Sequence, residues 1–260
     1  MGTLLDTIVA AHRAAAAADD RDLDTLVAAA GSTPPPRPFA SALVGDDGLA
    51  VIAEVKRRSP SRGDLALDLD PTALCRAYHA GGAACVSVLT DGEFFGGAPA
   101  DLAAAREACP LPVLRKDFTV DERDVADARL MGADAVLLIA AVLDDRLLGR
   151  CIALAAGLGL GALVEVHDEV EIDRAAAAGA GVIGVNQRDL RTFAVDGGLA
   201  ERLAPRLPPE AVWVAESGVG GQADAKGLAA AGYDAVLVGE ALLTSADPAA
   251  AVGALRAVGG

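Results

Sequence analysis

One pattern runs through the sequence from Val51 onward: a short apolar run, a loop, and an Ala-rich amphipathic helix, eight times over. The predicted strands cover Val51–Val55, Ala84–Leu89, Pro112–Leu114, Ala135–Ile139, Gly161–Val166, Val182–Val185, Val212–Ala215 and Ala235–Val238. The predicted helices lie near Pro71–Ala80, Ala98–Ala108, Asp121–Met131, Asp144–Gly157, Glu169–Ala178, Gly198–Ala204, Gln222–Ala231 and Pro248–Val258. Eight such units with right-handed crossovers close naturally into an α/β fold, the (β/α)₈ or TIM barrel.

The main competing fold is a doubly wound open sheet, which usually has fewer units and a Gly-rich phosphate loop after its first strand. Neither a Gly-x-Gly-x-x-Gly nor a Walker sequence follows Val51–Val55. Glycines also recur just before predicted strands, at Gly81-Gly82, Gly132, Gly179 and Gly232. A glycine there lets the preceding helix end in the left-handed conformation. These features favour the barrel.

The first 45 residues follow a different pattern. Leu4–Ala18 and Asp22–Ala30 have helical periodicity, and the segment Gly31–Pro38 is rich in proline, which cannot continue a helix. We therefore predict an N-terminal helical extension with a Pro-rich linker over residues 1–45. The barrel then covers residues 46–260, and the two parts form one structural domain.

The charge balance limits the classes of partner. A net charge of −15 and a pI near 4.5 argue against nucleic-acid binding, which needs a basic face. No uncharged apolar stretch approaches the roughly 18 residues of a membrane span, and the start has no signal-peptide pattern. We expect a small phosphorylated molecule as partner, and the chain is compatible with a monomer.

Cysteine and histidine spacing indicates neither disulfides nor a metal. The four cysteines are scattered without a Cys-x-x-Cys pair, which is typical of reduced thiols in the cytoplasm. His12, His79 and His167 are too far apart in sequence to form a ligand motif. We therefore expect no metal site.

Lysine is scarce, because Lys56, Lys116 and Lys226 are the only lysines among 22 basic residues. A desolvated lysine can release a proton near neutral pH, whereas arginine cannot. Lys56 and Lys116 each end a strand-like run, whereas Lys226 falls within a predicted helix. An ordinary ion pair is the alternative for each. Two lysines in matching positions indicate proton chemistry or a fixed point charge.

In a barrel of this class, the chemistry lies at the C-terminal ends of the strands. The polar residues found there are Glu54, Lys56, Lys116, Glu165, Asn186, Arg188, Glu216 and Glu240. Lysines and glutamates that converge can pair, and their pKa values then move apart, as acid–base chemistry requires. A structural ion-pair network is the alternative. The second and fourth strands are expected to contribute only Thr90 and apolar residues, as a wall for a flat ring.

The turns after the seventh and eighth strands are candidates for phosphate binding. Ser217-Gly218 and Gly239-Glu240 have small residues that permit close approach of a ligand to the backbone. In many barrels, these two loops present backbone N–H groups and a short helix to a phosphate. We therefore predict a phosphate monoester as ligand, with ordinary turn glycines as the alternative.

Five stretches together resemble the indole-3-glycerol phosphate synthase family of tryptophan biosynthesis. They are Ile52–Asp64, Pro112–Phe118, Leu163–His167, Ile183–Leu190 and Ala215–Val219, in the order typical of the family. The combination of Glu-x-Lys-x-x-Ser-Pro-Ser with Arg-Lys-Asp-Phe is the most specific part. The helical extension is also similar to the family's N-terminal segment.

The resemblance implies ring closure of 1-(2-carboxyphenylamino)-1-deoxyribulose 5-phosphate, with loss of carbon dioxide and water and without metal or organic cofactor. It implies that Lys116 is the general acid for the ketone oxygen. Lys56, supported by Glu54, would pair with the substrate carboxylate. Glu165 would serve proton transfer in the dehydration.

The remaining site residues also follow from the resemblance. Asn186 and Glu216 would position the intermediate. The apolar slot for the aromatic ring would consist of Phe95, Phe118, Leu137 and Ile139. The phosphate and loop contacts would be Ser59, Ser217, Gly218 and Gly239, with Arg188 and Glu240 as further substrate contacts.

Three positions depart from the family pattern. They are Gln187, Ala194 and Glu240, of which Glu240 puts side-chain help to the phosphate in doubt. Two other functions stay open: a Schiff-base aldolase with Lys56 or Lys116 as nucleophile, and a non-catalytic barrel that binds a sugar phosphate.

Overall fold

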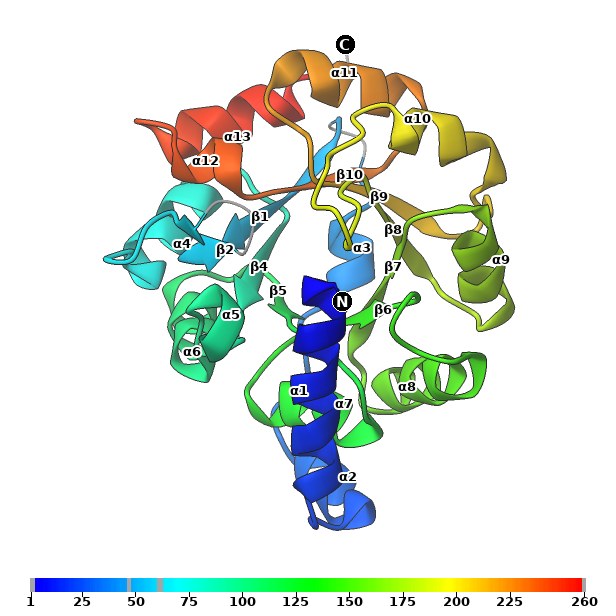
Figure 1. Cartoon of the computed structure of the whole chain (residues 1–260). Helices are drawn as coiled ribbons and strands as arrows, with labels where there is room; N and C mark the ends of the chain where they lie inside the picture. Colours follow the sequence, from blue (N-terminus) through cyan, green and yellow to red (C-terminus); the bar gives the residue numbers. More distant parts are fainter. Residues whose placement is uncertain (1–2, 46–47, 60–62, 259–260) are drawn as a thin grey trace.

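The computed structural model describes residues 3–45, 48–59 and 63–258, and its centre is a closed eight-stranded barrel (Figure 1). The strands are β1 (Ala50–Val55), β4 (Cys85–Leu89), β5 (Val113–Lys116), β6 (Ala135–Ile139), β7 (Gly161–Val166), β8 (Val182–Asn186), β9 (Val212–Glu216) and β10 (Ala235–Val238). Each strand pairs in parallel with the next, and β1 closes the ring by pairing with β10. The predicted (β/α)₈ barrel is confirmed.

Three strands extend further than predicted. β5 ends on Lys116, β8 on Asn186 and β9 on Glu216. These polar residues therefore belong to the hydrogen-bonded barrel itself, where the pairing of neighbouring strands holds their backbones in place. A functional group on a strand is positioned more rigidly than one on a loop.

Helices surround the barrel, and each lies after its strand as the repeat predicts (Figure 1). They are α4 (Pro71–Ala80), α6 (Pro99–Ala108), α7 (Glu122–Leu130), α8 (Asp145–Gly157), α9 (Glu169–Ala177), α10 (Leu199–Leu203), α11 (Gln222–Ala230) and α13 (Pro248–Arg256). Short elements that the sequence pattern did not predict lie in the loops: the hairpin β2 (Arg58–Ser59)–β3 (Gly63–Asp64), α5 (Gly92–Phe95) and the 3₁₀ turn Ala204–Arg206. The loop after β10 contains the short helix α12 (Glu240–Leu243), as expected for a phosphate loop.

Local sequence signals explain where the outer helices begin and end. Aspartate side chains accept backbone N–H groups in the first turn of five of them, at Asp70, Asp121, Asp144, Asp168 and Asp247. Part of the acidic composition therefore serves helix capping. The predicted left-handed glycines lie at Gly82, Gly132, Gly179 and Gly232, each with positive φ.

Alternate strand residues fill the barrel. Ile52, Leu114 and Leu163 point inward and are fully buried, whereas their neighbours Val51 and Val113 pack against the helices. The inward-facing residues of the lower layers are almost all aliphatic, which agrees with the low aromatic content of 3%. Among the described residues, the carboxylates and ammonium groups of the interior lie in the upper layers, at the C-terminal strand ends.

The N-terminal extension packs against both ends of the barrel. Helix α1 (Leu4–Ala18) lies across the mouth (Figure 1), where Ile8 and Val9 are buried in the same cluster as the barrel interior. Helix α3 (Phe39–Ala42), which the sequence pattern did not predict, lies at the opposite end. There Phe39 is buried beside Gly161, where an added Cβ would lie only 2.9 Å from the Phe39 side chain.

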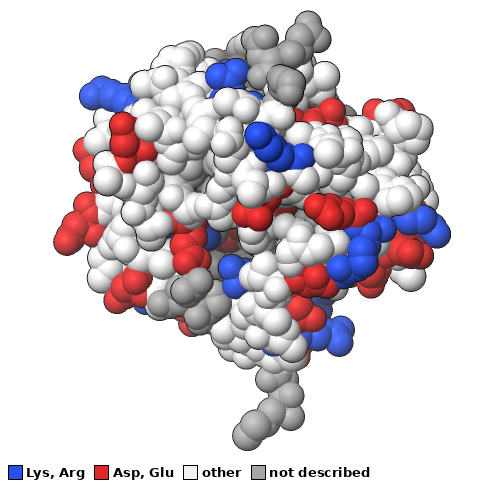
Figure 2. All heavy atoms as spheres, turned by 90° about the horizontal axis from the view of Figure 1, so that it is seen from above, with Lys and Arg blue, Asp and Glu red and all other residues white. Residues whose placement is uncertain are grey.

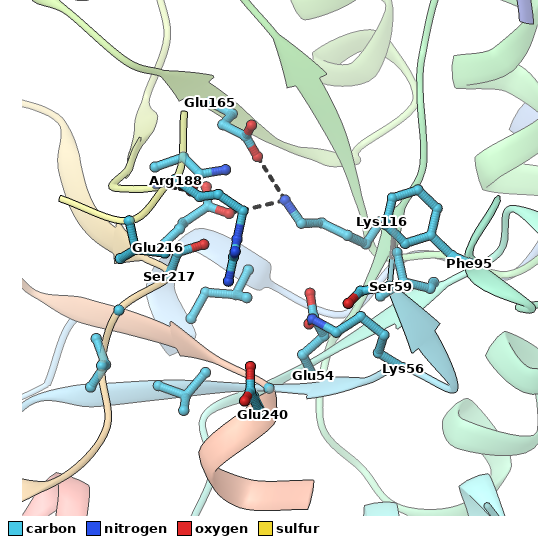
Figure 3. A pocket seen from close by; sticks show the side chains of 18 of the residues that line it. Glu54, Lys56, Ser59, Phe95, Lys116, Glu165, Arg188, Glu216, Ser217 and Glu240 are labelled. Carbon is cyan, nitrogen blue, oxygen red and sulfur yellow. Dashed lines mark hydrogen bonds and ion pairs between the residues drawn. The ribbon is translucent and has the colours of Figure 1, made fainter. Parts of the chain in front are cut away.

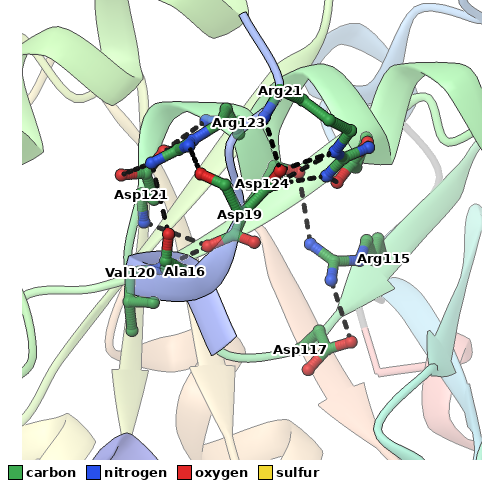
Figure 4. Close-up of polar contacts among 10 residues, drawn as sticks. Ala16, Asp19, Arg21, Arg115, Asp117, Val120, Asp121, Arg123 and Asp124 are labelled. Atoms are coloured by element: carbon green, nitrogen blue, oxygen red, sulfur yellow. Dashed lines mark hydrogen bonds and ion pairs between the residues drawn. The ribbon is translucent and has the colours of Figure 1, made fainter. Parts of the chain in front are cut away.

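The end of α1 and the helix that follows it also contact α7. Arg123 of α7 donates to the backbone carbonyls of Asp19 and Ala16 at the end of α1, and Arg21 pairs with Asp127 at 2.7 Å (Figure 4). Helix α2 (Leu23–Gly31) packs on the same helix. The expectation of a helical extension is confirmed.

The Pro-rich linker is anchored to the barrel rather than spanning open solvent. The backbone N–H of Arg37 donates to the buried Asp134 carboxylate at 2.6 Å, and the Arg37 guanidinium donates to the carbonyl of Leu111. Arg129, which is 3% exposed, donates to the carbonyls of Thr33 and Pro34. Arg129 thus satisfies two backbone carbonyls of the linker, whereas Arg37 attaches the linker to backbone carbonyls of the barrel.

Basic and acidic side chains are intermixed on the surface seen from above in Figure 2, and the basic ones form no continuous patch there. Within the described residues, none of the helices combines the length and the apolar character of a membrane span.

Candidate active site

A cavity of about 490 Å³ opens at the C-terminal ends of the strands. Every residue that the sequence predicted for the site lines it, from Glu54 on β1 to Glu240 at the start of α12. Its size is that of a pocket for a small organic ligand. Further lining residues that the sequence reasoning missed include Leu89, Asp91, Asp117, Leu190, Phe193 and Leu237.

Lys116 lies between two glutamates at the centre of the cavity (Figure 3). Its Nζ is 2.7 Å from Oε2 of Glu165 on β7 and 3.0 Å from Oε2 of Glu216 on β9. Both glutamates are 1% exposed. Because three strands hold the three groups, their contact depends on closure of the barrel.

Lys56 forms a second lysine–glutamate pair beside the first. Its ammonium group donates to Oε2 of Glu54, two residues earlier on β1. The period of two predicts this contact, because both side chains then point into the barrel. The ammonium groups of Lys56 and Lys116 therefore lie in one largely buried space with the carboxylates of Glu54, Glu165 and Glu216.

The buried groups affect each other's proton affinity. Burial opposes the charge on Lys116, but the attraction of Glu165 and Glu216 outweighs it and holds the pKa of Lys116 above its ordinary value. Burial also opposes the charge on Glu165, but Lys116 and His167 hold the pKa of Glu165 below its usual range. At Glu216 burial dominates and raises the pKa to about 7, since Glu216 shares the one lysine with Glu165.

Two glycines make room for these carboxylates. A Cβ added at Gly184 on β8 would lie 2.2 Å from Oε1 of Glu216, and a Cβ at Gly239 would lie 2.4 Å from Oε2 of Glu54. Neither glycine has positive φ. They are therefore required for space at the site and not for backbone conformation.

Gly184→Ala is expected to displace the Glu216 carboxylate and to lower kcat/KM by about 10- to 100-fold, because small misplacements of catalytic groups are costly. Gly149→Ala is the matched control, since Gly149 lies in α8 with no atom within 4 Å of an added Cβ. We expect normal activity there. Equal kcat/KM in both variants, measured by steady-state kinetics, would contradict the proposed packing constraint.

The apolar side of the cavity matches the predicted ring slot. Phe95, Phe118, Leu137 and Ile139 line it, and the rings of Phe95 and Phe118 lie 6.3 Å apart. The prediction that the second and fourth strands contribute only Thr90 and apolar residues was wrong. Asp91, immediately after β4, lines the cavity, whereas the hydroxyl of Thr90 donates to Asp117.

His12 contacts Asp91 and helps to hold it in place. From α1, its Nε2 lies 2.9 Å from Oδ2 of Asp91, while Oδ1 of Asp91 accepts the backbone N–H of Phe94 and caps α5. The His12 ring also lies 5.4 Å from the ring of Phe118. The extension thus supports the aromatic wall. The hydrogen bond with Asp91 raises the pKa of His12.

His12, Asp91 and Asp117 present oxygen and nitrogen atoms within 4.8 Å of one another. This clustering was not expected from their spacing in sequence. The carboxylates are already engaged, because Asp91 caps α5 and Asp117 accepts from Thr90 and Arg115. We assign the cluster to the attachment of α1 and not to a metal.

His12→Asn should raise KM by about 3- to 10-fold with a smaller change in kcat, as expected from losing one aromatic contact and one part-buried ion pair. The exposed His79 at the end of α4 provides the control variant His79→Asn. Substrate titration of both variants tests this. Unchanged KM in His12→Asn would show that α1 does not support the slot.

The predicted phosphate contacts lie in the same cavity, where Ser59 is near Phe95 because β2 packs against α5 (Figure 3). Ser59, Arg188, Ser217, Gly218, Gly239 and Glu240 all line it. Ser217 has φ +62, unusual for a residue other than glycine, and its carbonyl accepts from Nε2 of Gln187 at 2.8 Å. Gln187, which departs from the family pattern, therefore holds this turn. Glu240 remains an unfavourable neighbour for a phosphate on charge grounds.

The fold and the cavity together define the class of protein. Ionisable side chains from several strand ends converge on one pocket at the C-terminal face, which is the arrangement of (β/α)₈-barrel enzymes. Comparison with known proteins then narrows this class. The family model described as indole-3-glycerol phosphate synthase matches residues 5–255.

Named relatives agree with the family model. The chain is 56% identical over 223 residues to indole-3-glycerol phosphate synthase 2 of Streptomyces coelicolor, covering 86% of both chains. It is 50% identical to indole-3-glycerol phosphate synthase of Mycobacteroides abscessus, covering 99% of this chain and 95% of the relative. The chain belongs to the indole-3-glycerol phosphate synthase family, so the predicted family and enzyme class are confirmed.

More distant solved structures share only the fold. A 3-hexulose-6-phosphate synthase superposes with a TM-score of 0.61 at 19% identity, covering 81% of this chain and 99% of that structure. A thiamine phosphate pyrophosphorylase from Pyrococcus furiosus gives a TM-score of 0.59 at 17% identity, covering 82% and 96%.

Proposed function

We propose that the chain converts 1-(2-carboxyphenylamino)-1-deoxyribulose 5-phosphate to indole-3-glycerol phosphate by general acid–base catalysis. The observation that carries the proposal is Lys116 held between Glu165 and Glu216 at 2.7 and 3.0 Å in a buried cavity. Family membership supports the substrate. The cavity is lined both by an apolar slot and by an arginine and serines, which supports a ligand that contains a ring and a phosphate.

The first step joins the aromatic ring to the ketone carbon. Lys116 donates its proton to the ketone oxygen as this bond forms, and the ring carries a positive charge until carbon dioxide leaves. Glu165 and Glu216, both buried, stabilise that charge, because fixed carboxylates act strongly where water is excluded. Lys56, oriented by Glu54, pairs with the substrate carboxylate before its release.

In the second step the new hydroxyl takes up a proton and leaves as water while the neighbouring carbon loses a proton, which completes the indole ring; loss of carbon dioxide has already restored the benzene ring. Glu165 accepts the proton released in this dehydration, which requires it to be ionised at the start. Asn186 and Glu216 position the intermediate, and their strands pair directly at these residues. Ser59, Arg188, Ser217 and the glycines of the last two turns hold the phosphate.

The protonation state of Lys116 favours the acid role over a Schiff-base role. A Schiff-base nucleophile must be a neutral amine, but two adjacent carboxylates keep the Lys116 ammonium charged. Borohydride treatment in the presence of the substrate should therefore give no covalent adduct. A mass increase on Lys116 would instead support the aldolase alternative.

The direct test is incubation of the purified protein with the carboxyphenylamino-ribulose phosphate while indole fluorescence is followed. We expect a fluorescent product and release of one carbon dioxide per turnover, without added metal or cofactor. Binding of the substrate without product would support the non-catalytic sugar-phosphate barrel.

We further propose that the enzyme works as a cytoplasmic monomer. One chain supplies all the residues assigned to the site. All four cysteines are buried and unpaired, which is typical of a reducing compartment.

A further inference from the structure

The surroundings of the two glutamates that flank Lys116 are not symmetric. Their distances to the Lys116 ammonium differ by little, at 2.7 Å for Glu165 and 3.0 Å for Glu216. Beyond Lys116, however, Glu165 also contacts His167 on its far side. Oε1 of Glu216 is buried without a hydrogen-bond partner among the described residues.

His167 follows β7 directly and lies behind Glu165, outside the cavity lining. Its Nε2 is 3.4 Å from Oε1 of Glu165, and its Nδ1 is 3.0 Å from Oε2 of Glu171. Glu171 is itself fixed, because its Oε2 also accepts the backbone N–H of His167 at 2.8 Å. Asp168 caps α9 by accepting the N–H of Glu171. The imidazole thus lies between two carboxylates: its Nδ1 is within hydrogen-bond distance of Glu171, whereas its Nε2 is in ion-pair contact with Glu165 without a hydrogen bond.

Burial opposes a charge on His167, but the carboxylates of Glu165 and Glu171 outweigh it and raise the pKa of His167 to about 10. Asp189, in the loop after β8, adds a further negative group that interacts with it. The imidazole therefore carries a positive charge at neutral pH.

The charged groups around Glu165 and Glu216 come from several strands and differ between the two glutamates. Lys116 on β5 faces both glutamates, His167 faces only Glu165, and Glu54 on β1 adds negative charge nearer Lys116 and Glu216. One proton added to the pair is therefore stabilised on Glu216 and disfavoured on Glu165. Coupled carboxylates of this kind titrate as a pair, and their surroundings decide which one carries the proton.

We propose that His167, held by Glu171, is a positioning residue that keeps Glu165 ionised and directs the shared proton to Glu216. His167 would then decide which of the two carboxylates acts as the base. This part of the inference rests on the proposed function, since a base is needed only if the reaction takes place. The placement of the proton itself does not depend on the reaction. The two parts can therefore be tested separately.

His167→Gln keeps a hydrogen-bond donor near Glu165 but removes the positive charge. In the wild-type protein, Glu165 should stay ionised as the pH falls through 7, because the proton goes to Glu216. In the variant the two carboxylates compete, so the acidic limb of the kcat/KM profile should move up by about one pH unit. The loss of kcat/KM in the variant relative to the wild type should accordingly be about tenfold larger at pH 6 than at pH 8.5.

A second readout does not require activity. Carbon-13 NMR of glutamate carboxyl groups, assigned with Glu165→Gln and Glu216→Gln, should show Glu216 titrating alone near neutral pH in the wild type. In His167→Gln, both signals should shift together. Exposed His79 on α4 provides the control His79→Gln, which should leave the limb and the titration unchanged. If His167→Gln does not fold, His167→Asn is the second variant.

The outcomes separate the two proposals. An unshifted limb together with an unchanged carboxylate titration in His167→Gln would overturn the inference, as would an equal loss of activity at every pH. A wild-type protein without turnover would overturn the proposed function. The NMR titration would still decide where the proton lies.

Discussion

Lys116→Arg should lower kcat by about 1,000-fold or more, within the range attributed to a positioned general acid together with charge stabilisation. Arginine keeps the positive charge between Glu165 and Glu216, so the fold should persist. It cannot donate a proton near neutral pH, because its guanidinium does not deprotonate in proteins. Steady-state fluorescence kinetics and circular dichroism on the same sample measure both effects.

Lys226→Arg is the matched control for this substitution. Lys226 lies exposed on α11, away from the cavity, and its replacement should leave kcat and KM unchanged. Near-normal turnover in Lys116→Arg would contradict the proton-donor role and reduce Lys116 to a fixed charge.

Glu165→Gln should lower kcat by about 100- to 1,000-fold, since it removes the proposed base and one of the charges that stabilise the cationic intermediate. Glutamine has nearly the same shape, so substrate binding should change less than turnover. We expect KM to stay within a few-fold of the wild-type value. Kinetics under saturating substrate separate the two effects.

Glu169→Gln provides a control four residues further along the chain. Glu169 begins α9, and its side chain is 59% exposed. It should behave as the wild type. A kcat for Glu165→Gln close to that of Glu169→Gln would move the base to another residue, with Glu216 the next candidate.

The predictable part of the fold came from periodic patterns. Alternation and apolar runs located all eight barrel strands, and the helix-end glycines adopted the expected positive φ. Helix α3 was missed because its four residues are too short for a periodic signal and directly follow a proline-rich segment. It is held by the burial of Phe39 and not by local helix propensity.

The predictable part of the site came from topology. Once eight parallel strands are placed in a barrel, the residues at their ends must converge, so Glu54, Lys116, Glu165 and Glu216 could be grouped before any coordinates. Their assigned roles remain proposals. The contacts of His12 and His167 could not be predicted from strand order. His12 belongs to the N-terminal extension, and His167 lies just beyond the end of its strand.

The sequence by itself determined the barrel, the family and the strand-end residues of the cavity, because strand periodicity and local motifs are properties of neighbouring residues. Only the tertiary structure decided which charges touch: Lys116 with both Glu165 and Glu216, His167 behind Glu165, and His12 against Asp91. These contacts join groups from separate strands and helices, and their energies depend on distance and burial. These distances and this burial are fixed only when the barrel has closed.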